Sequence, residues 1–100
     1  MSKIYRVIAR VAELRAEPGK SPCPHFNLND EYDLSNPDDR KKVCKWAFHS
    51  MFPLVSVLEF GGTFPWESDP NRASVACPDP HRIVVFELRR EGELPSENEI

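Results

Sequence analysis

Hydrophobic and polar residues alternate in two long stretches near the two ends of the chain, residues 3–14 and 82–90. In the first stretch, one face would carry Tyr5, Val7, Ala9 and Val11. In the second, one face would carry Val84, Phe86 and Leu88. A period of two residues, rich in β-branched side chains, is typical of a strand with one buried face. The pattern therefore predicts two long strands, each covered on one side.

Two shorter stretches, residues 31–34 and 73–77, have the same character. The first follows the turn-forming pair Asn29-Asp30, and the second precedes the proline-rich turn at residues 78–80. We expect each of them to form a short strand.

A helix is expected to begin at Pro37, because Asn36 is a favourable N-cap and proline fits the first helical position. Apolar residues follow at helical spacing: Val43, Trp46, Ala47 and Met51, with Cys44, Phe48 and Phe52 beside them. An apolar face this wide predicts a helix that packs against a sheet. Pro53 is expected to interrupt the helix, because it lacks the N–H donor of the helical ladder.

The residues after this proline, 54–60, would form a second, kinked helical piece that ends at the pair Gly61-Gly62. The resulting order is β-β-α-β-β. It predicts an α+β domain with a largely antiparallel sheet and one proline-kinked helix. We expect residues 1–90 to form one compact domain and residues 91–100 to form a mobile acidic tail.

The charge balance changes the expected partners. The 100 residues include 13 Lys and Arg against 16 Asp and Glu, and residues 91–100 hold four of the glutamates with no Lys or Arg. A nearly neutral body with an acidic tail argues against nucleic-acid binding. No apolar run approaches the roughly 20 residues of a membrane span. The first residues also lack the apolar stretch of a signal peptide, which predicts a cytoplasmic protein without membrane contact.

Three cysteines suggest metal chemistry. Their odd number argues against a disulfide framework. A thiolate and an imidazole stand two residues apart in Cys23-Pro24-His25, and Cys44 with Cys77 would complete a set of four ligands. Zinc or iron is bound by such Cys and His sets. The alternative is that the thiols are small buried hydrophobic groups, as free cysteines usually are.

A second hypothesis is catalytic. Cys44 lies close to the expected start of a helix, where the helix dipole favours a thiolate nucleophile. His25 would act as its base, since His49 does not share the helix face of Cys44. Glu67 or Asp69 would move a proton.

The glycine and aromatic residues after the helix suggest a ligand site. Gly61 and Gly62 could expose backbone N–H groups to a ligand. The flat walls and the mouth of the pocket would be formed by Trp46, Phe64, Trp66 and Asp79. The alternative is that the glycines only end the helix and the aromatic residues cover the edge of the core.

Short motifs follow one another in order over residues 3–90: Cys23-Pro24-His25, Asn29-Asp30-Glu31, Cys44-x-x-Ala47, Phe52-Pro53, Gly61-Gly62-x-Phe64-Pro65-Trp66-Glu67-x-Asp69, Cys77-Pro78-Asp79-Pro80 and Val85-Phe86-Glu87-Leu88-x-Arg90. This ordered set resembles a family of small, uncharacterised stand-alone proteins that is common in anaerobic bacteria and archaea. Near the histidine the family pattern reads Cys-x-x-Gly-His-x-x-Gly-Asp, whereas this chain lacks the first glycine and has Asn29 in place of the second. The resemblance implies a compact domain with three cysteines and brings no established reaction.

Three functions remain open from the sequence. The preferred hypothesis is a small domain that binds a metal ion or a small ligand at the Cys/His site. The alternative is a small cofactor-independent enzyme that uses a thiol or His/Glu acid–base chemistry in the aromatic pocket. The third is a scaffold that docks through the acidic tail. A chain of 100 residues builds a pocket more easily at a subunit interface, so the binding hypothesis also predicts a homo-oligomer.

Overall fold

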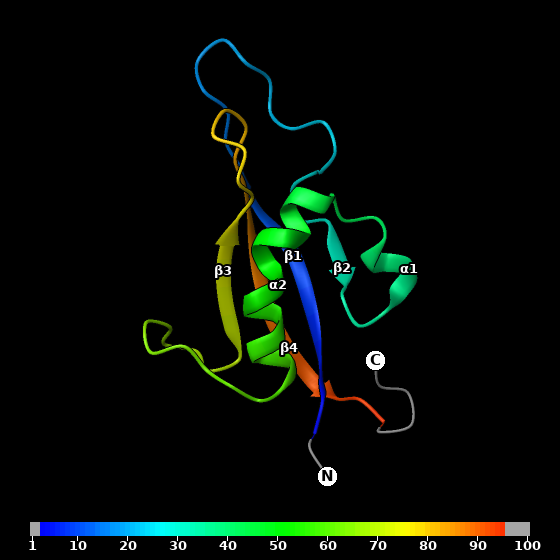
Figure 1. The fold of residues 1–100 in the computed structure, drawn as a ribbon. Coiled ribbons are helices and arrows are strands. Elements are labelled where there is room, and N and C mark those ends of the chain that lie inside the picture. Colours follow the sequence, from blue (N-terminus) through cyan, green and yellow to red (C-terminus); the bar gives the residue numbers. More distant parts are fainter. Residues whose placement is uncertain (1–2, 96–100) are drawn as a thin grey trace.

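A computed structural model of the chain describes residues 3–95. Within them, four strands form one antiparallel sheet in the order β2-β1-β4-β3 (Figure 1). The strands are β1 (Tyr5–Leu14), β2 (Glu31–Asp33), β3 (Arg72–Ala76) and β4 (Val84–Glu93). The predicted α+β class and the β-β-α-β-β order are confirmed.

The alternation in the two long strands is confirmed by burial. Val7, Ala9 and Val11 of β1 are fully buried, and so are their counterparts on β4. These two strands lie side by side at the centre of the sheet. β4 also continues to Glu93, so the first residues of the expected acidic tail belong to the sheet. Residues 96–100 of that tail lie outside the described residues.

The helical region differs from the prediction. The predicted start is confirmed, because the Asn36 side chain accepts a hydrogen bond of 2.9 Å from the Asp38 N–H at the start of α1 (Pro37–Arg40). The single helix from residue 37 onward is wrong, because α1 ends after one turn and α2 (Lys45–Glu59) begins separately. The chain turns at residues 41–44, which lets α1 stay beside β2 while α2 crosses the sheet.

Pro53 does not interrupt α2, so this expectation is also wrong. A proline at this position removes the hydrogen bond to the carbonyl of His49. Both residues are exposed, so water can replace the missing donor.

The predicted end of the helix is confirmed. Gly61 takes a φ of 88°, a conformation that favours glycine. The Gly61 N–H donates to the Leu58 carbonyl at 3.2 Å, and the Gly62 N–H donates to the Val57 carbonyl at 2.8 Å. This is the hydrogen-bond pattern of a Schellman motif.

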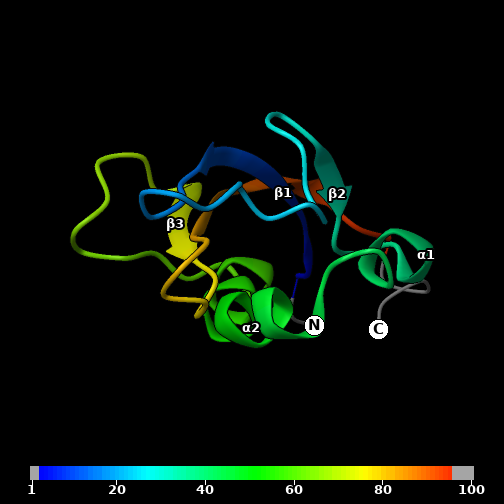
Figure 2. The same ribbon diagram turned by 90° about the horizontal axis from the view of Figure 1, so that it is seen from above.

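The molecule has two layers. α2 covers one face of the sheet, and the opposite face is open to solvent (Figures 1 and 2). The core lies between the layers and is formed by Val7, Ala9, Val11, Phe26, Leu34, Val43, Ala47, Met51, Val55, Leu58, Ala73, Val84, Phe86 and Leu88. Arg90 lies on the helix side of β4 and ties the two layers together. Its guanidinium donates to the carbonyls of Leu58, Gly62 and Pro70 at 2.7–3.0 Å.

Candidate functional site

The structure places all three cysteines at the rim of the core. Cys23, Cys44 and Cys77 are each partly buried and pack against core side chains. Cys77 is engaged locally, because its Sγ accepts a hydrogen bond of 3.3 Å from the Val84 N–H. Among residues 3–95, no three His, Cys, Asp or Glu side chains form a group that could hold a metal ion. The geometry therefore fits the alternative of small, partly buried thiols.

The residues of the catalytic hypothesis make their hydrogen bonds and ion pairs with other groups. Cys44 is the N-cap of α2, although its side chain makes no capping hydrogen bond. The His25 ring lies 3.0 Å from the carbonyl of Lys42. Glu67 instead lies near Arg72 at the start of β3. In the part of the chain that the structure describes, no hydrogen bond joins the thiol, the imidazole and the carboxylate.

The residues of the predicted glycine and aromatic site make hydrogen bonds and packing contacts within the chain. The N–H groups of Gly61 and Gly62 already donate to carbonyls of α2. The Phe64 ring packs against the core, and the Trp66 ring lies tilted beside it with 5.1 Å between ring centroids. Asp79 accepts a hydrogen bond of 2.9 Å from the His81 N–H, which lowers the pKa of this carboxyl. These contacts fit the alternative in which the glycines end the helix.

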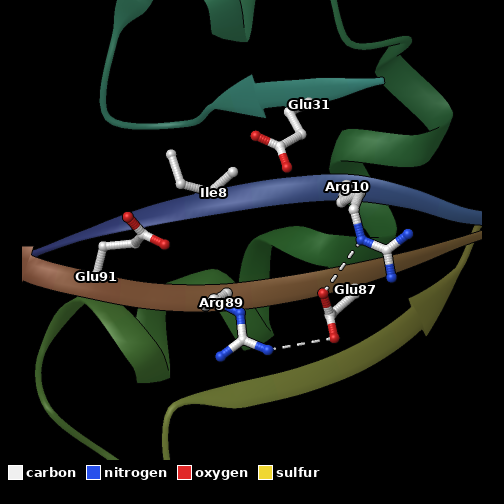
Figure 3. A pocket seen from close by; sticks show the side chains of 6 residues that line it. All are labelled: Ile8, Arg10, Glu31, Glu87, Arg89 and Glu91. Atoms are coloured by element: carbon white, nitrogen blue, oxygen red, sulfur yellow. Dashed lines mark hydrogen bonds and ion pairs between the residues drawn. The ribbon is translucent and has the colours of Figure 1, made fainter. Parts of the chain in front are cut away.

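A hollow of about 330 Å³ lies on the open face of the sheet (Figure 3). Ile8 is its only apolar lining side chain, and the others are Arg10, Glu31, Glu87, Arg89 and Glu91. Glu87 lies at the centre of the charges. Its carboxylate is 3.3 Å from the Arg10 Nε and 3.5 Å from an Arg89 Nη.

Both arginines of this hollow have partners within the chain. The Glu87 carboxylate also pairs with Arg72 at 3.4 Å, so three arginines share one carboxylate. Arg10 further donates to the Asn29 side chain at 2.8 Å, and Arg89 pairs with Asp69 at 3.5 Å. We interpret the hollow as part of an ion-pair network on a solvated sheet face, because its arginines already have partners.

A different groove, of about 230 Å³, lies between α2 and the segment of β2 and α1. Its lining is mainly apolar and consists of Leu34, Arg40, Phe48, Phe52, Val55, Ser56, Glu59 and Phe60. The rings of Phe48 and Phe52 are 5.8 Å apart between centroids. Phe52 and Phe60 are each more than half exposed, so they form open walls rather than core. We call this the α1–α2 groove.

Two charged side chains line the α1–α2 groove. Burial raises the pKa of Glu59, and the charge of Arg40 acts in the opposite direction. Arg40 donates only a long hydrogen bond of 3.4 Å to the Leu34 carbonyl. Neither side chain belongs to an ion pair within residues 3–95. An apolar groove with a few polar groups and a perturbed carboxyl has the character of a small-molecule site.

Sequence reasoning missed the polar residues of this groove. Phe48 and Phe52 were expected on the helix, but Arg40, Glu59 and Phe60 were not singled out. Trp46 was expected to be a pocket wall, whereas it is 65% exposed on the outer side of α2 and does not line the groove. One signal was present in the chain: residues 45–59 carry only two charged residues, one at each end.

No family model, curated protein or solved structure matches the chain in the comparisons. The resemblance to a small-protein family therefore stays a prediction. The described residues contain no helix with the length and hydrophobicity of a membrane span.

Proposed function

We propose that this protein is a small-molecule-binding domain and that the α1–α2 groove is its binding site. The observation that carries the proposal is the pairing of aromatic walls with two charged groups that lack ion-pair partners in the described residues. Phe48, Phe52 and Phe60 supply the walls, and Arg40 and Glu59 supply the charges. The proposal agrees with the binding function expected from the sequence, but it assigns the site to the α1–α2 groove instead of the cysteines.

The lining also indicates a class of ligand. A volume of about 230 Å³ lies below the roughly 300 Å³ at which sites for drug-sized molecules begin. The Arg40 guanidinium suits a carboxylate, and the Glu59 carboxylate suits an ammonium group. The phenylalanines suit a flat apolar body. A zwitterion with one ring, of the kind that an aromatic amino acid represents, meets all three conditions.

The test is a binding titration followed by NMR chemical shifts, with three probes of the same ring size. They are L-phenylalanine, 3-phenylpropionate and 2-phenylethylamine, which carry both charges, only the negative charge and only the positive charge. We expect L-phenylalanine to bind most tightly and to shift the signals of residues that line the groove. Phe48→Ala should weaken its binding about tenfold, because the ring loses a wall.

Two further variants test which charged residue binds which charged group of the ligand. Arg40→Gln should weaken L-phenylalanine and 3-phenylpropionate but leave 2-phenylethylamine unchanged, and Glu59→Gln should show the opposite selectivity. Trp66→Ala is the matched control, because Trp66 is an exposed aromatic residue outside the groove. The proposal fails if none of the probes shifts groove residues, or if Trp66→Ala weakens binding as much as Phe48→Ala.

A further inference from the structure

The outer side of α2 is unusually apolar for a helix on a protein surface. Trp46, Phe52 and Phe60 are 65%, 55% and 56% exposed. The 15 residues of α2 include only Lys45 and Glu59 as charged residues. A surface helix normally carries charged side chains on its solvent face, and a helix that is apolar all round is normally buried. Large exposed apolar patches mark interaction sites.

Three exposed residues of α2, together with its C-cap Phe60, form a ridge along the helix. Trp46, His49, Pro53 and Phe60 are exposed, and their spacing of three, four and seven residues keeps them on one side of the helix. We call these four residues the α2 ridge. Trp46 and Phe60 each lie seven residues from Pro53. The ridge therefore has a bulky ring at both ends and a centre at Pro53.

The two charged residues of α2 also lie on opposite sides of Pro53, Lys45 eight residues before it and Glu59 six residues after it. Lys45 is its first residue and Glu59 its last. When two such helices lie antiparallel, each positive end meets a negative end. The helix dipoles then also oppose one another, which is the favourable arrangement. A parallel pair would place like charges together.

We propose that the α2 ridge is the interface of a homodimer in which α2 packs antiparallel on α2 of a second copy. Trp46 then covers Phe60 of the second copy, and Lys45 pairs with Glu59 of the second copy. A second copy fits better than an unrelated partner, because both the ring positions and the charges complement themselves under a two-fold axis. Aromatic residues such as Trp46 are typical anchors of protein interfaces.

The dimer interface shares Glu59 and Phe60 with the lining of the α1–α2 groove, whereas the other residues of the α2 ridge lie outside the groove. Trp46, His49 and Pro53 do not line the groove, and Phe48 and Arg40 line it without belonging to the ridge. Phe48→Ala and Arg40→Gln should therefore weaken the binding of L-phenylalanine and leave the dimer intact. Failure of one proposal is thus distinguishable from failure of the other.

The experiment is sedimentation equilibrium of the full chain over a range of concentrations. We expect a monomer–dimer equilibrium with a dissociation constant that Trp46→Glu raises at least tenfold. Trp66→Glu is the control, because Trp66 is 70% exposed but belongs to a different segment. It should leave the dissociation constant unchanged. Circular dichroism of each variant shows whether the monomer remains folded.

A charge exchange tests the antiparallel arrangement. Lys45→Glu and Glu59→Lys should each raise the dissociation constant about fivefold, because each creates two pairs of like charges, one at each end of the interface. The variant with both substitutions should return it close to the wild-type value. A chain that remains monomeric at all concentrations would overturn the homodimer. A dimer that Trp66→Glu dissociates and Trp46→Glu does not would overturn this interface, and a double variant without recovery would overturn the antiparallel pairing.

Discussion

The two outer faces of the molecule have opposite chemistry. The open face of the sheet carries crossed ion pairs centred on Glu87, with Arg10, Arg72 and Arg89 around it. The outer face of α2 is lined by exposed rings. One face of an antiparallel sheet is commonly polar and solvated, and a surface helix is commonly polar on its outer side. The sheet follows this rule and the helix departs from it.

This difference indicates which of the two faces is suited to contact with water. Each arginine near Glu87 has a partner within its own chain, so a further layer on the sheet would have to remove water from charges that are already satisfied. The rings of Trp46, Phe52 and Phe60 have no such arrangement, and their exposure to water costs free energy. This difference supports the proposal that a second copy packs on the helix face rather than on the sheet face.

The largest expected effect separates the inside of the sheet from its open face. Phe86 and Glu87 are consecutive residues of β4 that point to opposite sides. Phe86 is fully buried, with its ring 5.1 Å from the ring of Phe26. Phe86→Ala should lower the free energy of unfolding by about 4 kcal/mol. Glu87→Gln should lower it by only about 1 kcal/mol, because its ion pairs are partly solvated.

Urea denaturation of the two variants and of the wild-type protein measures both values. A higher salt concentration should reduce the difference in free energy of unfolding between Glu87→Gln and wild type, because salt screens ion pairs. The difference between Phe86→Ala and wild type should stay unchanged. Equal losses in the two variants would mean that the ion-pair network stabilises the fold as strongly as the core does. The open face of the sheet would then not differ from the packed face in its contribution to stability.

A second pair of neighbours tests the connection between the layers. Arg90 donates to three main-chain carbonyls and to the Asn71 side chain at 3.1 Å, and its guanidinium lies 5.4 Å from the centre of the Tyr5 ring. Arg90→Met should cost about 3 kcal/mol, because it leaves several carbonyls without a donor. Arg89→Met should cost under about 1 kcal/mol, because Arg89 makes only ion pairs on the open face.

Thermal unfolding combined with hydrogen exchange checks this pair. Arg90→Met should also speed the exchange of the amides of Gly61 and Gly62, since the end of α2 loses its tie to β4. Arg89→Met should leave those amides protected. If both variants unfold at the same temperature, the orientation of Arg90 toward the helix is not what stabilises the contact between the layers.

The strands could be predicted because their burial pattern has a period of two that is visible in the residues themselves. The helices could be predicted only in part. Asn36 and Pro37 mark a true helix start, but this local signal does not tell how many turns follow. Pro53 indicates a break, yet its exposed position lets water replace the lost hydrogen bond. Local chemistry defines where a helix begins and ends more clearly than whether it continues.

The candidate site was harder to predict because it depends on the turn at residues 41–44. This turn brings Arg40 of α1 beside Glu59 at the far end of α2. In a single continuous helix the two residues would lie more than 25 Å apart, at about 1.5 Å per residue. Cysteines and histidines have reactive side chains, but sequence spacing does not tell which of them the fold brings together. Among the described residues, no three His, Cys, Asp or Glu side chains form a group that could hold a metal ion.

The smallest expected effect compares two carboxyls in different surroundings. Burial raises the pKa of Glu59, whereas a hydrogen bond of 2.9 Å from the Asp33 N–H lowers the pKa of Asp39. A raised folded-state pKa gives stability that is present below the ordinary carboxyl pKa and lost as the pH rises through the raised value. A lowered one gives stability that is present at neutral pH and lost as the pH falls through the lowered value.

Glu59→Gln should therefore make the protein slightly more stable than wild type at pH 7, and the gain should vanish at pH 3. Asp39→Asn should make it less stable at pH 7, with the loss shrinking toward pH 3. Urea denaturation at several pH values measures both differences, and NMR titration of the two carboxyls gives their pKa values directly.

Phe52→Ala should bring the pKa of Glu59 closer to its ordinary value, because water then enters the α1–α2 groove. A pKa of Glu59 that is not raised would mean that the groove side of α2 is as well solvated as the sheet face, and would remove one of the observations that support the ligand site.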